Sequence, residues 1–239
     1  MKILVINAGS SSIKFQLYRM PETKVLAKGL LERIGEEGSK LSYNYNDKTH
    51  CVQTKIKDHE QAMELILNTL ADKEVGVIDE IGEINAVGHR VVHGGEQYTS
   101  SVLIDNEVIA SIEKFADLAP LHNPPNLTGI RAAQHKLPGA KQVACFDTAF
   151  HASIPRVAYI YGLPYEFYEK YRVRRYGFHG TSHRYVARQA AKQLGRPLEE
   201  LKIITCHLGN GVSVTAVKNG HSVDTSMGFT PLEGVVMGT

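Results

Sequence analysis

Near its start the chain reads Ile3-Leu4-Val5-Ile6-Asn7-Ala8-Gly9-Ser10-Ser11-Ser12-Ile13-Lys14-Phe15-Gln16-Leu17-Tyr18. The four apolar residues at the front predict a buried strand, and the alternating residues from Ile13 to Tyr18 predict a second strand. The small polar residues between them predict a tight turn. Because side chains alternate along a strand, Lys14 shares one strand face with Ser12 and Gln16.

The same pattern returns about 200 residues later, where small polar residues again separate two strand-like stretches. Here Ile203-Ile204-Thr205-Cys206 leads into His207-Leu208-Gly209-Asn210-Gly211, and Val212-Ser213-Val214-Thr215-Ala216 follows. A turn of this kind presents backbone N–H groups and hydroxyls in a concave cluster, which suits an anion. Two such turns predict two halves of a molecule that close on one polyphosphate.

Neither turn is the common phosphate-binding loop. That loop requires G-x-x-x-x-G-K-[ST] before a helix, and the sequence contains no such string. For one copy taken alone, an ordinary hairpin turn explains the residues equally well, since small polar residues dominate turns. The second copy favours the phosphate-binding interpretation.

The composition indicates a globular protein rather than a nucleic-acid-binding or membrane protein. The net charge is only +2, hydrophobic residues make up 43 % of the 239 residues, and the apolar runs are strand-sized. The basic residues do not cluster with aromatic ones. No signal peptide precedes the first strand, so we expect a cytoplasmic protein. Of the three cysteines, Cys145 and Cys206 lie in apolar runs, which predicts buried, reduced thiols.

Residues 1–148 read as several strands followed by strands that alternate with helices, which predicts an α/β domain with a mixed sheet. Asp58-x-x-Gln61 is typical of a helix start, Asn106 is a candidate cap of a second helix, and Pro124-Pro125 opens a third. The expected hairpin partners are Leu41–Tyr45 and Cys51–Ile56.

Residues 149–239 predict a second, partial domain. Residues 150–176 form a loop-rich connection, and Thr181 or Ser182 is expected to cap a helix that Gly195 ends. Asn219-Gly220 is a strong hairpin signal after the second strand pair. The strands and helices that follow the first turn have no counterpart after the second, so we expect a truncated second domain.

Three positions are candidates for chemistry on an anion. Arg90 ends a strand in Gly88-His89-Arg90-Val91-Val92-His93-Gly94-Gly95 and can fork onto a carboxylate or phosphate, although a structurally paired arginine is an equal alternative. Asp147 directly follows a buried strand, a common functional position in α/β folds, where a turn cap is the alternative. His179 precedes a helix, and for His183, four residues on, an ordinary surface or core histidine is favoured.

Taken together, six motifs closely resemble the acetate kinases, which belong to the superfamily of sugar kinases, heat-shock ATPases and actin. Two of them are Asn7–Lys14 and Gly88–Gly95, already quoted. The others are Ala119-Pro120-Leu121-His122-Asn123-Pro124-Pro125, Phe146-Asp147-Thr148-Ala149-Phe150-His151, Tyr176-Gly177-Phe178-His179-Gly180-Thr181-Ser182-His183 and His207–Gly211. The resemblance implies a duplicated, actin-like and ribonuclease H-like α/β fold.

The resemblance also implies roles for individual residues. Asn7 helps to place the metal, Arg90 binds the carboxylate and the moving phosphoryl group, Asp147 is the essential acidic residue, and His179 steadies the transition state. The residues implied to bind the ATP phosphates are Ser10, Ser12, Lys14, His207, Leu208, Gly209, Asn210 and Gly211. The residues implied to bind acetate are Arg90, Val92, Leu121, His122, Phe178 and Pro231.

The implied reaction is the reversible transfer of the ATP γ-phosphoryl group to acetate, which gives acetyl phosphate and ADP, with Mg²⁺ or alternatively Mn²⁺. A homodimer is implied for the full-length protein, and the family continues beyond Thr239 with a second arginine, an adenosine pocket and a late glutamate. A propionate or butyrate kinase stays open, because one methylene is worth only about 1–3 kcal/mol in a pocket. An ATPase switch of the same fold without an acceptor is the alternative from another class.

Overall fold

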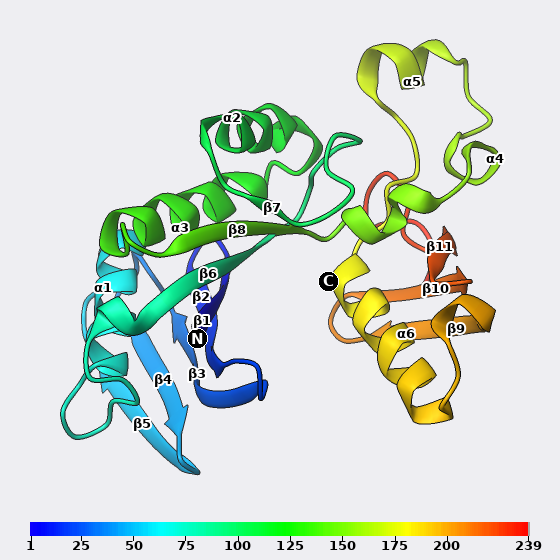
Figure 1. Cartoon of the computed structure of the whole chain (residues 1–239). Helices are drawn as coiled ribbons and strands as arrows, with labels where there is room; N and C mark the ends of the chain where they lie inside the picture. Colours follow the sequence, from blue (N-terminus) through cyan, green and yellow to red (C-terminus); the bar gives the residue numbers. More distant parts are fainter. Residues whose placement is uncertain (239) are drawn as a thin grey trace. The chain divides into compact units, whose positions relative to one another are not determined.

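The two strands predicted at the start of the chain are β1 (Lys2–Ala8) and β2 (Ser12–Arg19), which pair antiparallel along their whole length in the computed structural model (Figure 1). The structure describes residues 1–238. The chain separates into two units. The first holds Met1–Val91 and Val102–Cys145, and the second holds Val92–Ser101 and the chain from Phe146 onward.

The first unit is built on an eight-stranded sheet with the order β5-β4-β3-β2-β1-β6-β8-β7. Strand β1 pairs antiparallel with β2 but parallel with β6, so the sheet is mixed, as the sequence predicted. Its other strands are β3 (Lys24–Glu32), β4 (Lys40–Tyr45), β5 (Lys48–Gln53), β6 (Ile84–Val91), β7 (Val102–Leu103) and β8 (Lys141–Phe146).

Helices α1 (His59–Leu70) and α3 (Asn123–Lys136) pack against each other, and α3 lies against β1 and β6 (Figure 1). Their apolar residues join the inward-facing residues of the strands in one core. The face of the sheet turned away from this core carries polar residues, because the strands alternate in polarity. The remaining helices of the unit are α2 (Asn106–Lys114) and the 3-10 helices η1 (Ile81–Glu83) and η2 (Phe115–Leu118).

Helix starts were predicted with mixed success. The Asp58 side chain accepts a hydrogen bond from the Gln61 backbone N–H at 2.9 Å, which confirms the predicted start of α1. The cap of α2 is Asp105 rather than Asn106, because Asp105 has the extended backbone of a cap and accepts from the Val108 N–H at 2.9 Å. The proline pair at positions 124 and 125 lies in the first turn of α3, as predicted.

The hairpin of β4 and β5 begins its second strand earlier than predicted. Asn46 and Asp47 both have positive φ angles, 45° and 59°. A two-residue turn of this kind lets Lys48 pair at once with Tyr45. Strand β5 therefore covers Lys48–Gln53, so the predicted strand Cys51–Ile56 began and ended three residues too late in the sequence.

The second unit contains a three-stranded antiparallel sheet with the order β11-β10-β9. Strands β9 (Lys202–Leu208) and β10 (Val212–Lys218) are the second predicted pair, and Asn219 and Gly220, both with positive φ, connect β10 to β11 (His221–Thr225) as predicted. The loop-rich connection contains only short helices: η3 (Ala149–Ser153), α4 (Arg156–Tyr159) and α5 (Glu166–Tyr171).

Helix α6 (Gly180–Leu194) packs against β9 and η3, and η4 (Leu198–Glu200) follows it. Its C-terminal residue is followed by Gly195 in a left-handed conformation, as predicted. Its cap is not Thr181 or Ser182 but His179, because the positive φ of His179, 57°, turns the chain and the Gly180 N–H binds the Asp147 carbonyl at 2.9 Å.

The prediction of buried cysteines was wrong. Cys206 is exposed and Cys145 is partly exposed, although all three cysteines are free. The reason is that β9 is an edge strand whose residues alternate, so that Thr205 is buried while Ile204, Cys206 and Leu208 are exposed. The residues of this apolar run show no alternation in the sequence, yet only one side of the strand they form is buried.

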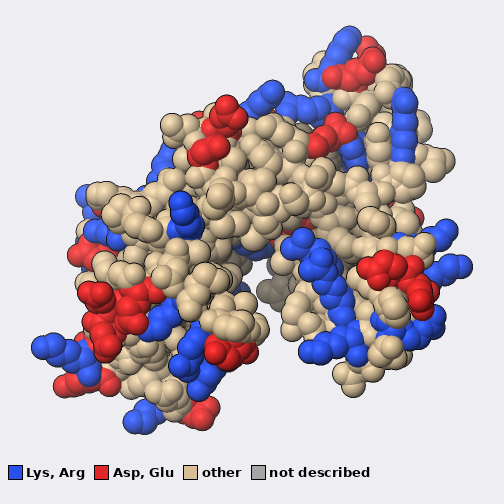
Figure 2. All heavy atoms as spheres, viewed as in Figure 1, with Lys and Arg blue, Asp and Glu red and all other residues tan. Residues whose placement is uncertain are grey.

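Basic side chains gather along α6 in the space-filling view (Figure 2), where Arg184, Arg188 and Lys192 are spaced four residues apart on one helix face. In the described part of the chain, no helix is both long and apolar enough to cross a membrane.

Candidate active site

Side chains from two helices bind backbone carbonyls of the first turn. The Gly9 N–H binds the Ser12 carbonyl at 2.8 Å and closes the turn. The ring Nε2 of His59, at the start of α1, lies 2.7 Å from the Gly9 carbonyl oxygen, and the Asn126 amide of α3 donates to the Ala8 carbonyl at 2.7 Å. The turn is thus fixed to the core, while Ser10 at its tip is exposed.

Helix α3 comes unusually close to the end of β1 next to this turn. A Cβ at Gly129 would lie 2.5 Å from the Cβ of Ala8, so only glycine fits at this point of the helix. Glycine costs helix stability relative to alanine. The close approach gives a packing reason for this cost, because it brings Asn126 into reach of the Ala8 carbonyl.

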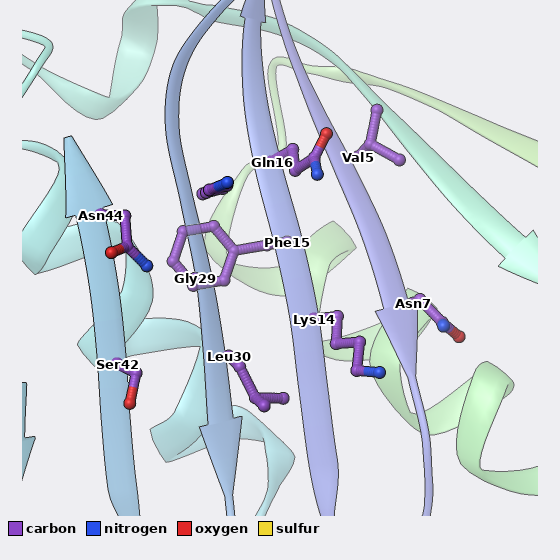
Figure 3. Close-up of a pocket in the computed structure, with 10 residues that line it drawn as sticks. Val5, Asn7, Lys14, Phe15, Gln16, Gly29, Leu30, Ser42 and Asn44 are labelled. Atoms are coloured by element: carbon purple, nitrogen blue, oxygen red, sulfur yellow. The ribbon is translucent and has the colours of Figure 1, made fainter. Parts of the chain in front are cut away.

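A groove of about 590 Å³ follows the polar face of the sheet beside the turn (Figure 3). Asn7 and Lys14 lie directly opposite each other on β1 and β2, and both line the groove with Gln16 and Lys28. The Phe15 ring lies under Gly29, where a Cβ would be 2.5 Å from the ring. The predicted face of Lys14 and Gln16 is therefore an open, partly basic surface.

Arg90 belongs to the same part of the first unit. Its Nη1 donates to the Asn7 Oδ1 at 3.3 Å, so the structure brings Asn7, Lys14 and Arg90 together on β1, β2 and β6. The residue before Arg90 on β6, His89, is buried and donates its Nε2–H to the Gln142 Oε1 at 2.8 Å. Burial lowers the pKa of His89 to about 4, so this histidine is a neutral core group.

Asp147 lies at the start of the second unit and is only 3 % exposed. Its carbonyl accepts from Gly180 N–H, and a Cβ at Gly180 would lie 2.3 Å from that carbonyl oxygen. The following residue, Thr148, accepts from the Gly94 N–H at 3.2 Å. Asp147 is therefore fixed beside the N-terminus of α6, next in space to His179.

His179 meets the second turn. Its ring stacks on the His207 ring with centroids 4.0 Å apart, and its Nδ1 lies 2.9 Å from the Ser213 Oγ. A Cβ at Gly211 would lie 3.1 Å from the Cε1 and 3.2 Å from the Nε2 of His179. The predicted residues Asp147, His179, His207 and Gly211 are thus collected in one unit.

The other residues of the second turn lie on its outer side. The Gly209 N–H binds the Gly211 carbonyl at 3.1 Å, so the second turn closes over two residues, whereas the bond from Gly9 to Ser12 spans three. Leu208 and Asn210 are exposed, and the Asn210 carbonyl accepts from the Gly238 N–H at 3.1 Å. The expectation of two similar turns is confirmed for the antiparallel hairpins, while their closing hydrogen bonds differ by one residue.

The residues implied for the acetate pocket are divided between the units. Val92 and Phe178 are buried in the second unit, where Phe178 and Tyr176 pack edge-on against the His93 ring. Pro231 is an exposed residue of the same unit. Leu121, 79 % exposed, and His122, the residue before α3, belong to the first unit.

Sequence reasoning missed a layer of polar residues under His179. His183 is 1 % exposed, with its Nδ1 2.8 Å from the Thr205 Oγ1 and its Nε2 2.7 Å from the Ser213 Oγ. Of the two alternatives for His183, the core histidine is correct. The alternation of hydroxyls with valines in Val212-Ser213-Val214-Thr215 was the available signal, because it places both hydroxyls on the inner face of β10.

Comparison with known proteins identifies the family. The model of the acetokinase family matches residues 2–239. The chain belongs to the acetokinase family.

The acetokinase chain is 64 % identical to the acetate kinase of Thermotoga maritima over 239 residues, which is all of this chain and 59 % of that protein. The crystal structure of Porphyromonas gingivalis acetate kinase matches with a TM-score of 0.96 at 49 % identity and covers 100 % of this chain and 60 % of the other. A propionate kinase from Francisella tularensis matches with a TM-score of 0.93 at 42 % identity and the same coverage. The chain spans about 60 % of the length of these relatives.

These relatives confirm the predicted α/β fold class, and the structure shows one large mixed sheet with flanking helices, while the three-stranded sheet is antiparallel. The structure also allows a test of whether the predicted side chains suit Mg²⁺. Asn7 offers an amide oxygen in the first unit and Asp147 a carboxylate in the second, and residues 1–238 contain no cluster of three His, Cys, Asp or Glu suited to a metal. Mg²⁺ commonly takes one or two protein oxygens together with phosphates and waters, and each of these two groups by itself offers an oxygen of that kind.

Proposed function

We propose that the complete protein transfers the γ-phosphoryl group of ATP reversibly to acetate and gives acetyl phosphate and ADP. The observation that carries the proposal is the acetokinase match over residues 2–239, within which Arg90, Asp147 and His179 all fall. The hydrogen bond from Arg90 to Asn7 supports it, because it holds a guanidinium against Asn7, which lies opposite Lys14 and lines the open groove.

The chemistry asks for positioning and charge stabilisation rather than for a base. One carboxylate oxygen of acetate forms a bond to the γ-phosphorus, while the bond from that phosphorus to the bridging oxygen breaks and its electron pair stays on ADP. Acetate is already ionised at neutral pH, so no proton has to be removed. The negative charge of the transition state spreads over the equatorial oxygens of the moving group.

In this proposal Arg90 forks onto the carboxylate and the moving phosphoryl group, and His179 opposes charge from the second turn. Lys14, Ser10, Ser12 and the turn His207–Gly211 hold the nucleotide phosphates. Mg²⁺, or Mn²⁺ in its place, would neutralise charge on the β- and γ-phosphates, with Asn7 on its protein side and Asp147 as an orienting group. A cytoplasmic homodimer is part of the same proposal and rests on the family resemblance.

The direct test is Arg90→Ala in the full-length enzyme, with acetyl phosphate trapped by hydroxylamine. We expect kcat to fall by roughly 10³–10⁵-fold, the range for one arginine at a transferring phosphoryl group, and KM for acetate to rise. Arg131→Ala is the matched control, because Arg131 is an exposed arginine of the same unit that pairs with Glu113. Normal kcat and acetate saturation in Arg90→Ala would show that Arg90 is structural, and ATP turnover independent of acetate would favour the ATPase switch.

One relative, at 42 % identity, is a propionate kinase, and the size of the methyl pocket would separate propionate from acetate. Val92 is buried in the second unit and is a proposed wall of the methyl pocket. Val92→Ala should shift the ratio of kcat/KM for propionate over acetate upward by about 10-fold, the lower end of the roughly 10–200-fold that about 1–3 kcal/mol for a methylene allows. An unchanged ratio would remove Val92 from the pocket.

A further inference from the structure

A continuous chain of hydrogen bonds leads from the interior of the second unit to the ring of His179. The Thr205 Oγ1 lies 3.4 Å from the Thr215 carbonyl oxygen and 2.8 Å from the His183 Nδ1. The Ser213 Oγ lies 2.7 Å from the His183 Nε2 and 2.9 Å from the His179 Nδ1. Thr205, His183, Ser213 and Thr215 are all buried. The links among these four residues are therefore shielded from water, while the His179 ring at the end of the chain is partly exposed.

The central histidine carries one ring proton only. Burial, and after it the neighbouring His151, His179 and His207, lowers the pKa of His183 to about 3, so His183 is neutral at ordinary pH. A neutral imidazole donates from one nitrogen and accepts at the other. When Ser213 also donates its hydroxyl proton within the chain, that proton and the ring proton of His183 point the same way, which leaves two arrangements.

The two arrangements differ at Thr205. In the first, Thr205 donates to the Thr215 carbonyl and accepts from the His183 Nδ1–H, so Ser213 donates to the His183 Nε2 and accepts from a proton on the His179 Nδ1. In the second, Thr205 donates to His183 and every link reverses, which places the proton of neutral His179 on Nε2. Only the first arrangement also uses the hydrogen bond from Thr205 to the Thr215 carbonyl.

We propose that Thr205, His183 and Ser213 are positioning residues that hold the ring proton of His179 on Nδ1. The opposite edge of the ring, Cε1–Nε2, lies against Gly211 of the second turn. Neutral His179 then offers an acceptor at Nε2, and it donates a hydrogen bond from that nitrogen only after it takes up a second proton. Its value for phosphoryl transfer rests on the proposed function, whereas the position of the proton does not.

The experiment is ¹⁵N–¹H correlation NMR of the histidine rings in this chain, at a pH above which the cross-peaks of His179 no longer move. His179→Gln identifies those cross-peaks among the 11 histidines by their loss. We expect the pattern of the Nδ1–H tautomer. A native protein with His179 in the Nε2–H tautomer would overturn the proposal.

Thr205→Val is the more specific test, because the hydrogen bonds of Thr205 go to His183 and to the Thr215 carbonyl rather than to His179 itself. Valine gives the His183 Nδ1 no acceptor, and a buried donor without a partner is costly, so the His183 proton should move to Nε2, Ser213 should turn, and His179 should change to Nε2–H. Thr205→Ser retains the hydroxyl and should retain the native pattern. Ser182→Ala, which removes the partner of His207 rather than of His179, should also retain it.

An Nδ1–H pattern that persists in Thr205→Val would show that the chain does not set the tautomer. Should Thr205→Val fail to fold, Ser213→Ala tests the last link directly. It removes the acceptor of the His179 Nδ1–H, so the population of the Nε2–H tautomer should rise, and an unchanged pattern contradicts the proposal. An inactive full-length enzyme with the expected tautomer would refute the proposed function and leave this inference intact.

Discussion

The imidazole rings of His179 and His207 stack with centroids 4.0 Å apart and planes inclined by 21°. Each ring is held by a different serine, His179 by Ser213 on β10 and His207 by Ser182 in α6. The second turn therefore meets a ring pair of fixed orientation.

Asp147→Asn in the full-length enzyme should lower kcat by impairing the placement of the phosphoryl group and the metal. Since acetate needs no base, the acidic side of the kcat–pH profile should keep its shape in the variant. Steady-state kinetics across the acidic range provides the measurement, with Asp224→Asn as a control, because Asp224 is an exposed aspartate of the same unit. An acidic limb at unusually high pH that disappears in Asp147→Asn would make Asp147 a general base instead.

Stability should fall as the pH drops from about 6.5 toward 4. Burial lowers the pKa values of His89 and His151 from 6.5 to about 4. In this interval the unfolded chain binds protons that the folded chain rejects, so the free energy of unfolding decreases with decreasing pH. Each such histidine contributes on the order of 3 kcal/mol, present in full above pH 6.5, since one pKa unit corresponds to about 1.4 kcal/mol.

Urea unfolding at a series of pH values tests this stability profile. His89→Gln should flatten the slope between pH 6.5 and 4, because it removes one of the buried titrating groups. His135→Gln is the matched control, since His135 is exposed and contacts Glu60 at the surface. The same slope in His89→Gln as in the parent would mean that another group causes the acid sensitivity.

Gly129→Ala should destabilise the first unit by about 1–3 kcal/mol, although alanine favours helices. The added Cβ would lie 2.5 Å from that of Ala8, so α3 or the end of β1 has to move. The double variant Ala8→Gly with Gly129→Ala removes the clash and should recover part of the lost stability. Gly139→Ala, where a Cβ meets nothing within 4 Å, is the control, and thermal unfolding is the measurement. A Gly129→Ala protein as stable as the parent would show that the close approach is not maintained.

The hairpins could be predicted from the sequence because local signals define them. The alternation around Lys14 and the glycine-containing turns determine strand, turn and face with residues close in the chain. Where two neighbouring residues were both able to cap a helix, as with Asp105 and Asn106, the sequence did not distinguish them, because the choice depends on the backbone angle of each residue.

The polar interior of the second unit could not be predicted for a different reason. His183 and Ser213 are 30 residues apart, and only the packing of α6 on the sheet joins them. The left-handed backbone of His179 is equally a tertiary effect, since non-glycine residues seldom adopt it without other contacts. The exposed Cys206 follows from the position of β9 at the edge of its sheet, which an isolated apolar run does not reveal.

The chemical contrast between the two interiors has a calorimetric consequence. The largest buried cluster of the first unit is made of aliphatic and aromatic side chains, whereas a buried imidazole of α6 binds hydroxyls of β9 and β10, and a further pair of hydroxyls joins β10 to β11. Exposure of apolar surface raises the heat capacity on unfolding, and exposure of polar surface lowers it. The second unit should therefore show the smaller heat-capacity increment per residue and the flatter dependence of stability on temperature.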